Sequence, residues 1–312
     1  MLTKLLEIRE LFIIFYKRYE IYIIPILKFL TFIIILVKLN GTLGYATVLN
    51  KSMINIVLAI ILTLLPGSWA ILCLGFIIIT HLAFASIEVA IVIGLLLAVL
   101  YLMFIHLAPK LSYLIIAVPL CFSLNIPYVI PIFAGLFLTP LSVIPIIFGT
   151  VIYYFSSFIN TLISLKPEDS DLPEIPTIML EVYKETVNRV FSDKEMIFTV
   201  IIFSLVVIIT YSISRLSNDY IWYITISIAT VVNIILFIIG NLALDLNLGL
   251  VGVIFGSILS GIIVAIMQFF KCIVDYSRAE KVQYEDDDYF YYVKAIPKIH
   301  ISKPKRKVKR IK

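Results

Sequence analysis

MIFTVIIFSLVVIITYSI, residues 196–213, decides the fold class of this chain. The stretch has 18 residues and no charged side chain. A helix of that length rises about 27 Å, close to the roughly 30 Å thickness of the hydrocarbon core of a bilayer. The sequence therefore predicts a membrane-spanning helix here, and every other apolar run can be measured against the same length.

The composition of the whole chain indicates the same class. Of its 312 residues, 62% are hydrophobic and 14% are charged, whereas soluble domains average roughly 45–50% and about 25%. So few charged residues cannot cover a water-exposed surface. We expect an all-α, polytopic integral protein of a cell membrane, of the bacterial plasma-membrane type. The first 20 residues carry charges of both signs and no small-residue cleavage site, which argues against a removable signal peptide.

Apolar runs of two lengths follow one another along the chain. The long ones, each able to span a bilayer, are residues 21–39, 87–107, 141–165, 196–213, 221–242 and 250–270. The short ones are residues 53–65, 69–85, 111–124 and 127–139. This predicts about ten transmembrane or re-entrant segments. The chain crosses the membrane ten times if every short run spans, and six times if the short runs pair into re-entrant hairpins.

Helix breaks separate the two members of each short pair. They lie at Pro66 and Gly67 in the first pair, and at Pro127 in the second, with Pro131 close behind. The order short, short, long occupies residues 53–107 and recurs in residues 111–165. Two such units would be inverted relative to each other, an arrangement that in transporters places a site near the bilayer midplane. The alternative is a coincidental resemblance between two runs of short helices.

Lysine and arginine near the ends of the chain predict that both termini are cytoplasmic. An even number of crossings then places residues 166–195 outside the cytoplasm. Within that loop, residues 177–191 have a helical apolar period, typical either of an amphipathic helix on the membrane face or of the first turns of the next spanning helix. The expected regions are a cytoplasmic amphipathic helix (1–20), an N-terminal membrane module (21–165), the hydrophilic loop (166–195), a three-helix membrane module (196–274) and a cytoplasmic tail (275–312).

Ionisable side chains inside apolar runs are candidates for function, because burying a charge in lipid is costly. Glu88, Lys28 and His81 are such residues, and Asn125 lies at the second helix break. Glu88 could be a buried proton or cation site, paired with Lys28. Alternatively, Glu88 faces the positive end of its own helix dipole after the N-cap Ser86, and Lys28 extends to the membrane surface.

Sequence motifs of enzymes and metal sites are absent. No phosphate-binding glycine loop, zinc-protease motif or serine-hydrolase motif occurs, so we expect no catalytic residue and no cofactor. The three cysteines lie in separate apolar runs, without the spacing of zinc ligands. Near the C-terminus, the four-residue rhythm of Gly252, Gly256 and Ser260 predicts a face for close helix packing.

The last 31 residues differ from the rest. We expect the final helix to continue through CIVDYSRAEKV, ending near four consecutive acids. Tyr289 and Tyr291 then belong to an alternating, strand-like segment that needs a partner edge. The polybasic end should bind anionic lipid headgroups and not nucleic acid. Its cations include Lys305, Arg306, Lys307, Lys309 and Arg310. The tail either fixes the topology alone or, as the aromatic residues favour, docks a cytoplasmic protein.

Two functions fit these patterns. One is a transporter or permease-like protein for a small or largely apolar solute, with a pathway framed by the breaks at Pro66 and Pro127. The other is a non-catalytic scaffold or assembly subunit whose tail docks a partner. The sequence leaves the oligomeric state open.

Overall fold

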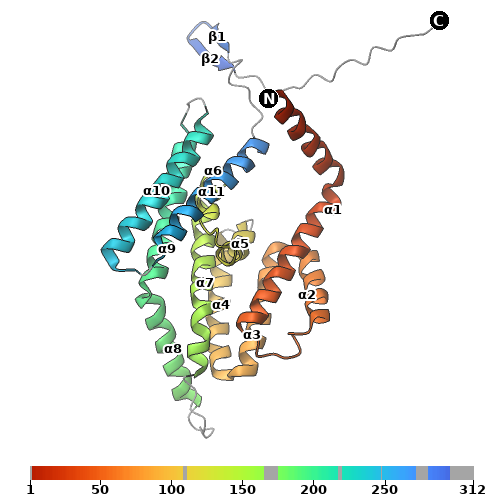
Figure 1. Ribbon diagram of the computed structural model, residues 1–312, viewed down its shortest axis with the longest axis vertical. Helices are drawn as coiled ribbons and strands as arrows, with labels where there is room; N and C mark the ends of the chain where they lie inside the picture. The colour runs from red at the N-terminus through yellow and green to blue at the C-terminus, as the bar shows by residue number, and fades with distance from the viewer. Residues whose placement is uncertain are drawn as a thin grey trace, which may run out of the picture.

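A computed structural model describes residues 2–107, 111–164, 175–216, 220–246, 248–271 and 280–295 of the chain. Most helices run along the long axis, with the start of α1 and a β-hairpin at one end and α8 at the other (Figure 1). Among the described residues, five helices are long and apolar enough to cross a membrane. They are α1 (Leu2–Thr42), α3 (Gly67–Ala85), α9 (Lys194–Ser214), α10 (Ile221–Leu244) and α11 (Leu250–Lys271).

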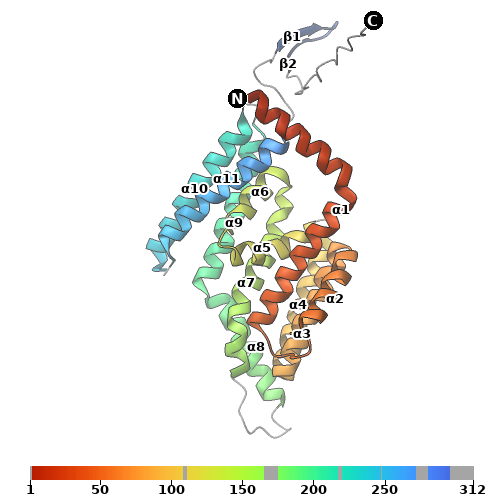
Figure 2. The same ribbon diagram turned by 45° about the vertical axis from the view of Figure 1, so that its right-hand side comes forward.

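The expected boundary after residue 20 does not coincide with a helix end. Residues 2–42 form the single helix α1, which bends along its course (Figure 2). Pro25 lies inside it, and a proline in a helix removes one backbone hydrogen bond and bends the axis. The N-terminal part of α1 reaches α11, where Arg9 Nη2 donates to the carbonyl oxygen of Phe270 over 3.1 Å.

Helices α1 to α4 form the first module. α2 (Ser52–Leu64) runs antiparallel to α1, and Asn40 Nδ2 at the end of α1 donates to Asn55 Oδ1 at the start of α2. Pro66 separates α2 from α3, because the residue before a proline disfavours helical geometry. Ser86 separates α3 from α4 (Ile87–Leu107).

The second module consists of α5 to α7 and α9 to α11, which share one hydrophobic core. Two short helices open it. α5 (Tyr113–Ser123) and α6 (Val129–Phe137) join through a turn in which Asn125 has a φ of 58°. A 3-10 turn, η2 (Pro140–Ser142), then leads into the 22-residue α7 (Val143–Ser164). α5 and α6 have 11 and 9 residues, so each rises only about 14–17 Å, roughly half of a hydrocarbon core.

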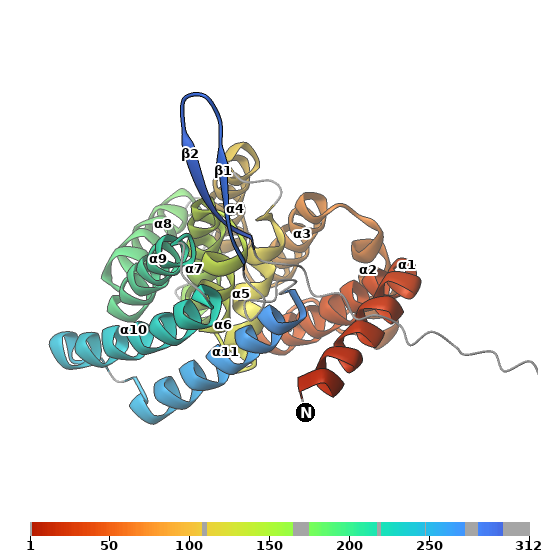
Figure 3. The same ribbon diagram turned by 90° about the horizontal axis from the view of Figure 1, so that it is seen from above.

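Small residues let the second module pack closely. Gly135 of α6 lies against Val207 and Thr210 of α9, and Gly149 of α7 lies against Val118 of α5. The resulting core contains Phe203, Val206 and Phe237 from α9 and α10. Seen down the long axis, α1, α2 and α3 lie on one side, α9 and α10 on the other, and α5 and α7 between them (Figure 3).

The hydrophilic segment contains α8 (Ile175–Ser192), which is a separate helix. Asp193 follows it and caps α9, because its Oδ1 accepts the backbone N–H of Met196 at 3.0 Å. The apolar face of α8 is only partly used: Val182 is buried, whereas Leu180 and Phe191 are exposed.

The expectation for the last helix is wrong. α11 is described as far as Lys271, and residues 272–279 lie outside the described residues. Residues 280–282, which the sequence predicts to be helical, belong to a strand, β1 (Glu280–Glu285). It pairs antiparallel with β2 (Phe290–Ala295), which occupies the segment predicted to be strand-like. The partner edge therefore comes from the chain itself, because the four residues between the strands reverse the chain direction.

The lengths of the helices match the predicted repeat only in its second copy. Residues 111–164 give helices of 11, 9 and 22 residues. Residues 52–107 give 13, 19 and 21, so α3 is not short. The inverted repeat stays a prediction.

Packing at Gly135 generates a first prediction. A methyl group there would lie 2.6 Å from Thr210 Cβ and 2.7 Å from the Val207 carbonyl oxygen. We expect Gly135→Ala to lower the free energy of unfolding by about 1–3 kcal/mol, the usual cost of overpacking. Thermal unfolding of the detergent-solubilised protein measures this. Gly252→Ala is the control, since no atom lies within 4 Å of its added methyl; equal melting temperatures would contradict close α6–α9 packing.

Candidate functional site

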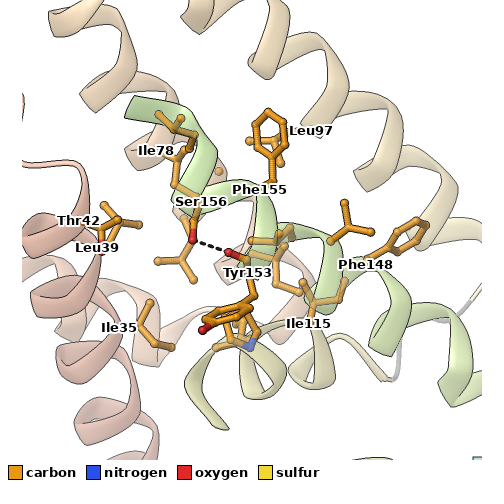
Figure 4. Close-up of a pocket in the computed structure, with 18 of the residues that line it drawn as sticks. Ile35, Leu39, Thr42, Ile78, Leu97, Ile115, Phe148, Tyr153, Phe155 and Ser156 are labelled. Atoms are coloured by element: carbon orange, nitrogen blue, oxygen red, sulfur yellow. Dashed lines mark hydrogen bonds between the residues drawn. The ribbon is translucent and has the colours of Figure 1, made fainter. Parts of the chain in front are cut away.

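An apolar cavity of about 470 Å³ lies between α1, α3, α4, α5 and α7 (Figure 4). Aliphatic and aromatic side chains such as Ile35, Leu39, Ile78 and Phe155 make up most of its wall. Its volume is within the range of small-molecule sites, which are mostly apolar with a few polar groups. The cavity is therefore the best candidate for a functional site.

A second cavity, of about 420 Å³, adjoins the first. The two share six lining residues, which are Ile71, Gly75, Leu97, Ile115, Phe148 and Ile152. Gly75 keeps this region open, because no atom lies within 4 Å of the position that a Cβ would occupy. The two cavities thus form adjacent lobes around one shared wall.

The cavities lie where the hydrophobic cores of the molecule meet. α1, α2 and α3 share one core around Leu36 and Leu62, and α5, α6, α7, α9, α10 and α11 share another around Phe203. Between them, Ile115 of α5 contacts Ile71 of α3 and Phe148 and Ile152 of α7. A third core bridges the two modules, because Leu82 of α3 and Val89 and Ile93 of α4 pack with Phe155 and Ile159 of α7. The cavities lie beside this shared core.

Polar groups on the wall are few. Thr42 Oγ1 and Ser156 Oγ each donate to a carbonyl oxygen of their own helix, those of Lys38 and Tyr153. Figure 4 shows the second of these bonds. Of the described residues that line the two cavities, Lys38 alone is charged. The wall can hold an apolar ligand and offers one cation.

The α5–α6 hairpin closes one side of the cavity. Pro119, Leu120 and Ser123 of α5 line it, and the ring of Phe122 stacks on that of Tyr153 at 4.1 Å between centroids. At the turn, Tyr128 packs edge-to-face on Phe203 and Phe237, near the middle of α9 and α10. These contacts hold the start of α6 inside the protein, whereas Leu124 and Asn125 of the turn are exposed.

Glu88 and His81 are both buried, and the structure gives each side chain a hydrogen-bond partner. Glu88 lies in the first turn of α4, and its Oε2 accepts the hydroxyl of Ser86 at 2.6 Å. Ser86 Oγ also accepts the N–H of Val89, as an N-cap does. His81 Nδ1 accepts the N–H of Ala46 at 3.2 Å, while Nε2 is buried with no hydrogen-bond partner in the described chain.

Lys28 and Glu88 do not form the suggested pair. Leu43, just past the end of α1, packs in the same cluster as Val89. Lys28 precedes the end of α1 by 14 residues, about 21 Å along the helix. Its side chain is exposed, as is that of Asn125 at the α5–α6 turn.

The predicted break and packing residues occupy different surroundings. Pro66 and Gly67 are exposed at the start of α3, whereas Pro127 and Pro131 are buried around the start of α6. Gly256 and Ser260 are buried in α11, and Tyr128 lies against Gly256. Gly252 is exposed, so it does not belong to the packing face. Ser257 does belong to this face, and its hydroxyl oxygen accepts a 2.8 Å hydrogen bond from Asn233 Nδ2.

The tail hairpin presents one apolar face. Val282 lies opposite Val293 and Tyr284 opposite Tyr291, on the same side of the two strands. Tyr289 closes the turn, because its carbonyl oxygen accepts the N–H of Asp286, and its ring is tilted against that of Tyr291 with 6.2 Å between centroids. Lys305, Arg306, Lys307, Lys309 and Arg310 lie outside the described residues.

The sequence analysis missed Lys38 and Gly75. Lys38 lies near the end of an apolar run, where a lysine ordinarily marks a helix end, and Gly75 is one small residue in a long helix. Their roles depend on α1 and α3 facing α7 across a gap, which no local pattern reveals. Comparison with known proteins adds no guide: no family model, curated protein or solved structure matches the chain.

The hairpin turn depends on the ionised form of Asp286. Its Oδ1 accepts the N–H groups of Asp288 and Tyr289, and its Oδ2 accepts the hydroxyl of Tyr291 at 2.9 Å. The hydroxyl of Tyr291, followed by these N–H groups, lowers the pKa of Asp286. The turn is therefore stabilised above the ordinary aspartate pKa of about 4 and loses this contribution as pH falls through the lowered pKa.

We expect Asp286→Asn to speed amide hydrogen exchange in residues 280–295 of the full chain at neutral pH. Wild-type protein should lose protection, corrected for intrinsic exchange, only when the pH falls below about 4. Asp287→Asn is the matched control, because the carboxylate that accepts these hydrogen bonds of the turn belongs to Asp286. Equal exchange in the two variants would show that the Asp286 carboxylate does not hold the turn.

Proposed function

We propose that this protein is a membrane transporter or permease-like protein that takes a small or largely apolar solute from the bilayer. The observation that carries the proposal is the two-lobed apolar cavity between the modules. A soluble, polar solute would find almost no hydrogen-bonding partners on this wall, whereas an apolar one would lose little on leaving lipid.

We further propose eight crossings of the membrane. α1, α2, α3, α4, α7, α9, α10 and α11 span it, and α5 and α6 form a re-entrant hairpin. Non-helical backbone at membrane depth is tolerated where protein covers it, and the contacts of Tyr128 with Phe203 and Phe237 cover the start of α6. An even number of crossings keeps both termini on the cytoplasmic side, in line with the basic residues near each end.

The seam between the modules offers a means of movement. Many transporters alternate access by rocking one helix bundle against another. We propose that the two modules move in this way about the core that α3 and α4 share with α7. The re-entrant hairpin lies at this seam, since α5 packs on α7 and Ile115 contacts Ile71 of α3.

The orientation predicts a labelling pattern in intact cells. In a background without the native cysteines, Lys184→Cys on α8 should react with a membrane-impermeant maleimide, because α8 lies outside the cytoplasm. Glu285→Cys in the hairpin should react only after permeabilisation. Both positions are exposed in the folded protein, so accessibility reports the side of the membrane. The reverse pattern would overturn the proposed topology.

Filling the cavity tests the transport proposal. Gly75→Leu adds a side chain into open space shared by both lobes. In proteoliposomes, we expect wild-type protein to speed the movement of a nitrobenzoxadiazole-labelled lipid between leaflets, measured by dithionite quenching, and Gly75→Leu to slow it about tenfold or more, the effect of losing roughly 1.4 kcal/mol of binding.

Gly252→Leu is the control, because it adds the same side chain to an exposed position on α11. Matching thermal unfolding of the two variants would show that neither is misfolded. Movement at the protein-free rate in wild-type proteoliposomes, or equal movement in both variants, would count against transport through the cavity.

The tail hairpin supports a second candidate, a scaffold that docks a cytoplasmic partner. A two-stranded hairpin is marginally stable alone. A partner protein that packs on its apolar face would therefore stabilise it; this face is formed by Val282, Tyr284, Tyr291 and Val293. Removing residues 280–312 separates the two functions: lipid movement that survives this deletion supports transport by the membrane body.

A further inference from the structure

We propose that the first cavity holds one acyl chain of an anionic membrane lipid, whose charged headgroup pairs with Lys38. The inference rests on the proposed function, since it assigns a substrate class to the same cavity. It identifies Lys38, on α1, as the residue that selects the headgroup.

The size of the cavity fits a hydrocarbon chain. Its volume of about 470 Å³ is within the range of ligand sites. The wall of the first lobe is almost wholly aliphatic and aromatic, as a hydrocarbon chain requires.

The position of Lys38 fits a headgroup. Lys38 precedes the last residue of α1 by four positions, on the same stretch of helix as the lining residues Ile35, Leu39 and Thr42. Its side chain is exposed, and a flexible lysine keeps its ammonium group near the polar boundary while its stem lies along apolar surface. An anion at the mouth of the cavity would neutralise this charge.

The polar boundary of the protein also lies at this end of α1. Asn40 Nδ2 donates to the Leu49 carbonyl and to Asn55 Oδ1, and Asn50 Nδ2 donates to the Gly44 carbonyl. Such a cluster of amides indicates the depth at which polar groups are tolerated. Given cytoplasmic termini, this depth belongs to the opposite leaflet, so the lipid enters from the leaflet that faces away from the cytoplasm.

Photocrosslinking of the full chain in nanodiscs tests the proposal. The probes are phosphatidylglycerol and phosphatidylcholine, each with a diazirine on one acyl chain, and labelled residues are mapped by mass spectrometry. We expect phosphatidylglycerol to label cavity residues more strongly than phosphatidylcholine. Lys38→Gln should lower phosphatidylglycerol labelling about fivefold, the effect of removing one basic residue at a lipid surface, and Lys38→Arg should retain it.

Lys28→Gln is the matched control, because it removes an exposed lysine of the same helix that does not line the cavity. It should leave labelling unchanged. Equal labelling by both lipids and no effect of Lys38→Gln would overturn the headgroup assignment, while loss of labelling in Gly75→Leu would still support the apolar cavity. Stronger labelling by a diazirine fatty acid than by phosphatidylglycerol would reassign the ligand to a free fatty acid. Absence of cavity labelling by every probe would overturn both the assignment and the proposed function.

Discussion

The structure depends on one constraint: lipid offers no hydrogen bonds to the backbone. Every N–H and C=O at membrane depth must therefore find a partner inside the protein, and helices satisfy this requirement along their own axes. Helix ends are the exception, because their last turns leave groups unpaired. Here Ser86 caps α4, Asp193 caps α9, and Tyr128 at the start of α6 packs on the ring of Phe203.

Close packing is distributed unevenly as a result. In lipid, helices gain little from the hydrophobic effect, so they associate through close contact at small residues and through polar pairs. The second module has both, as at Gly135 against α9 and in the Asn233–Ser257 hydrogen bond. At Gly75, by contrast, no atom lies within 4 Å of the position of a Cβ. The cavity lies beside the core that α4 shares with α7, at a place where the side chains of the two modules do not fill the space.

That contrast connects the fold to its proposed function. A membrane protein with a uniformly packed interior has no space for a solute, whereas one with a dry gap between modules can accept molecules that are already dissolved in the bilayer. A single cation at such a gap has a large influence, since few other polar groups compete with it. Lys38 is in this position, and in the proposed function its charge would distinguish one amphiphile from another.

The sequence by itself determined the membrane class, the breaks at Pro66, Ser86 and Pro127, and the strand-like segment of the tail, because helix length, proline geometry and residue alternation are local properties. It also placed Glu88 in the first turn of its helix. Only the tertiary structure decided that α1 continues unbroken past residue 20, that β1 supplies the partner strand for β2, and that Lys38 and Gly75 line a common cavity. These features follow from which surfaces meet across large distances in the chain, and no window of sequence contains both surfaces.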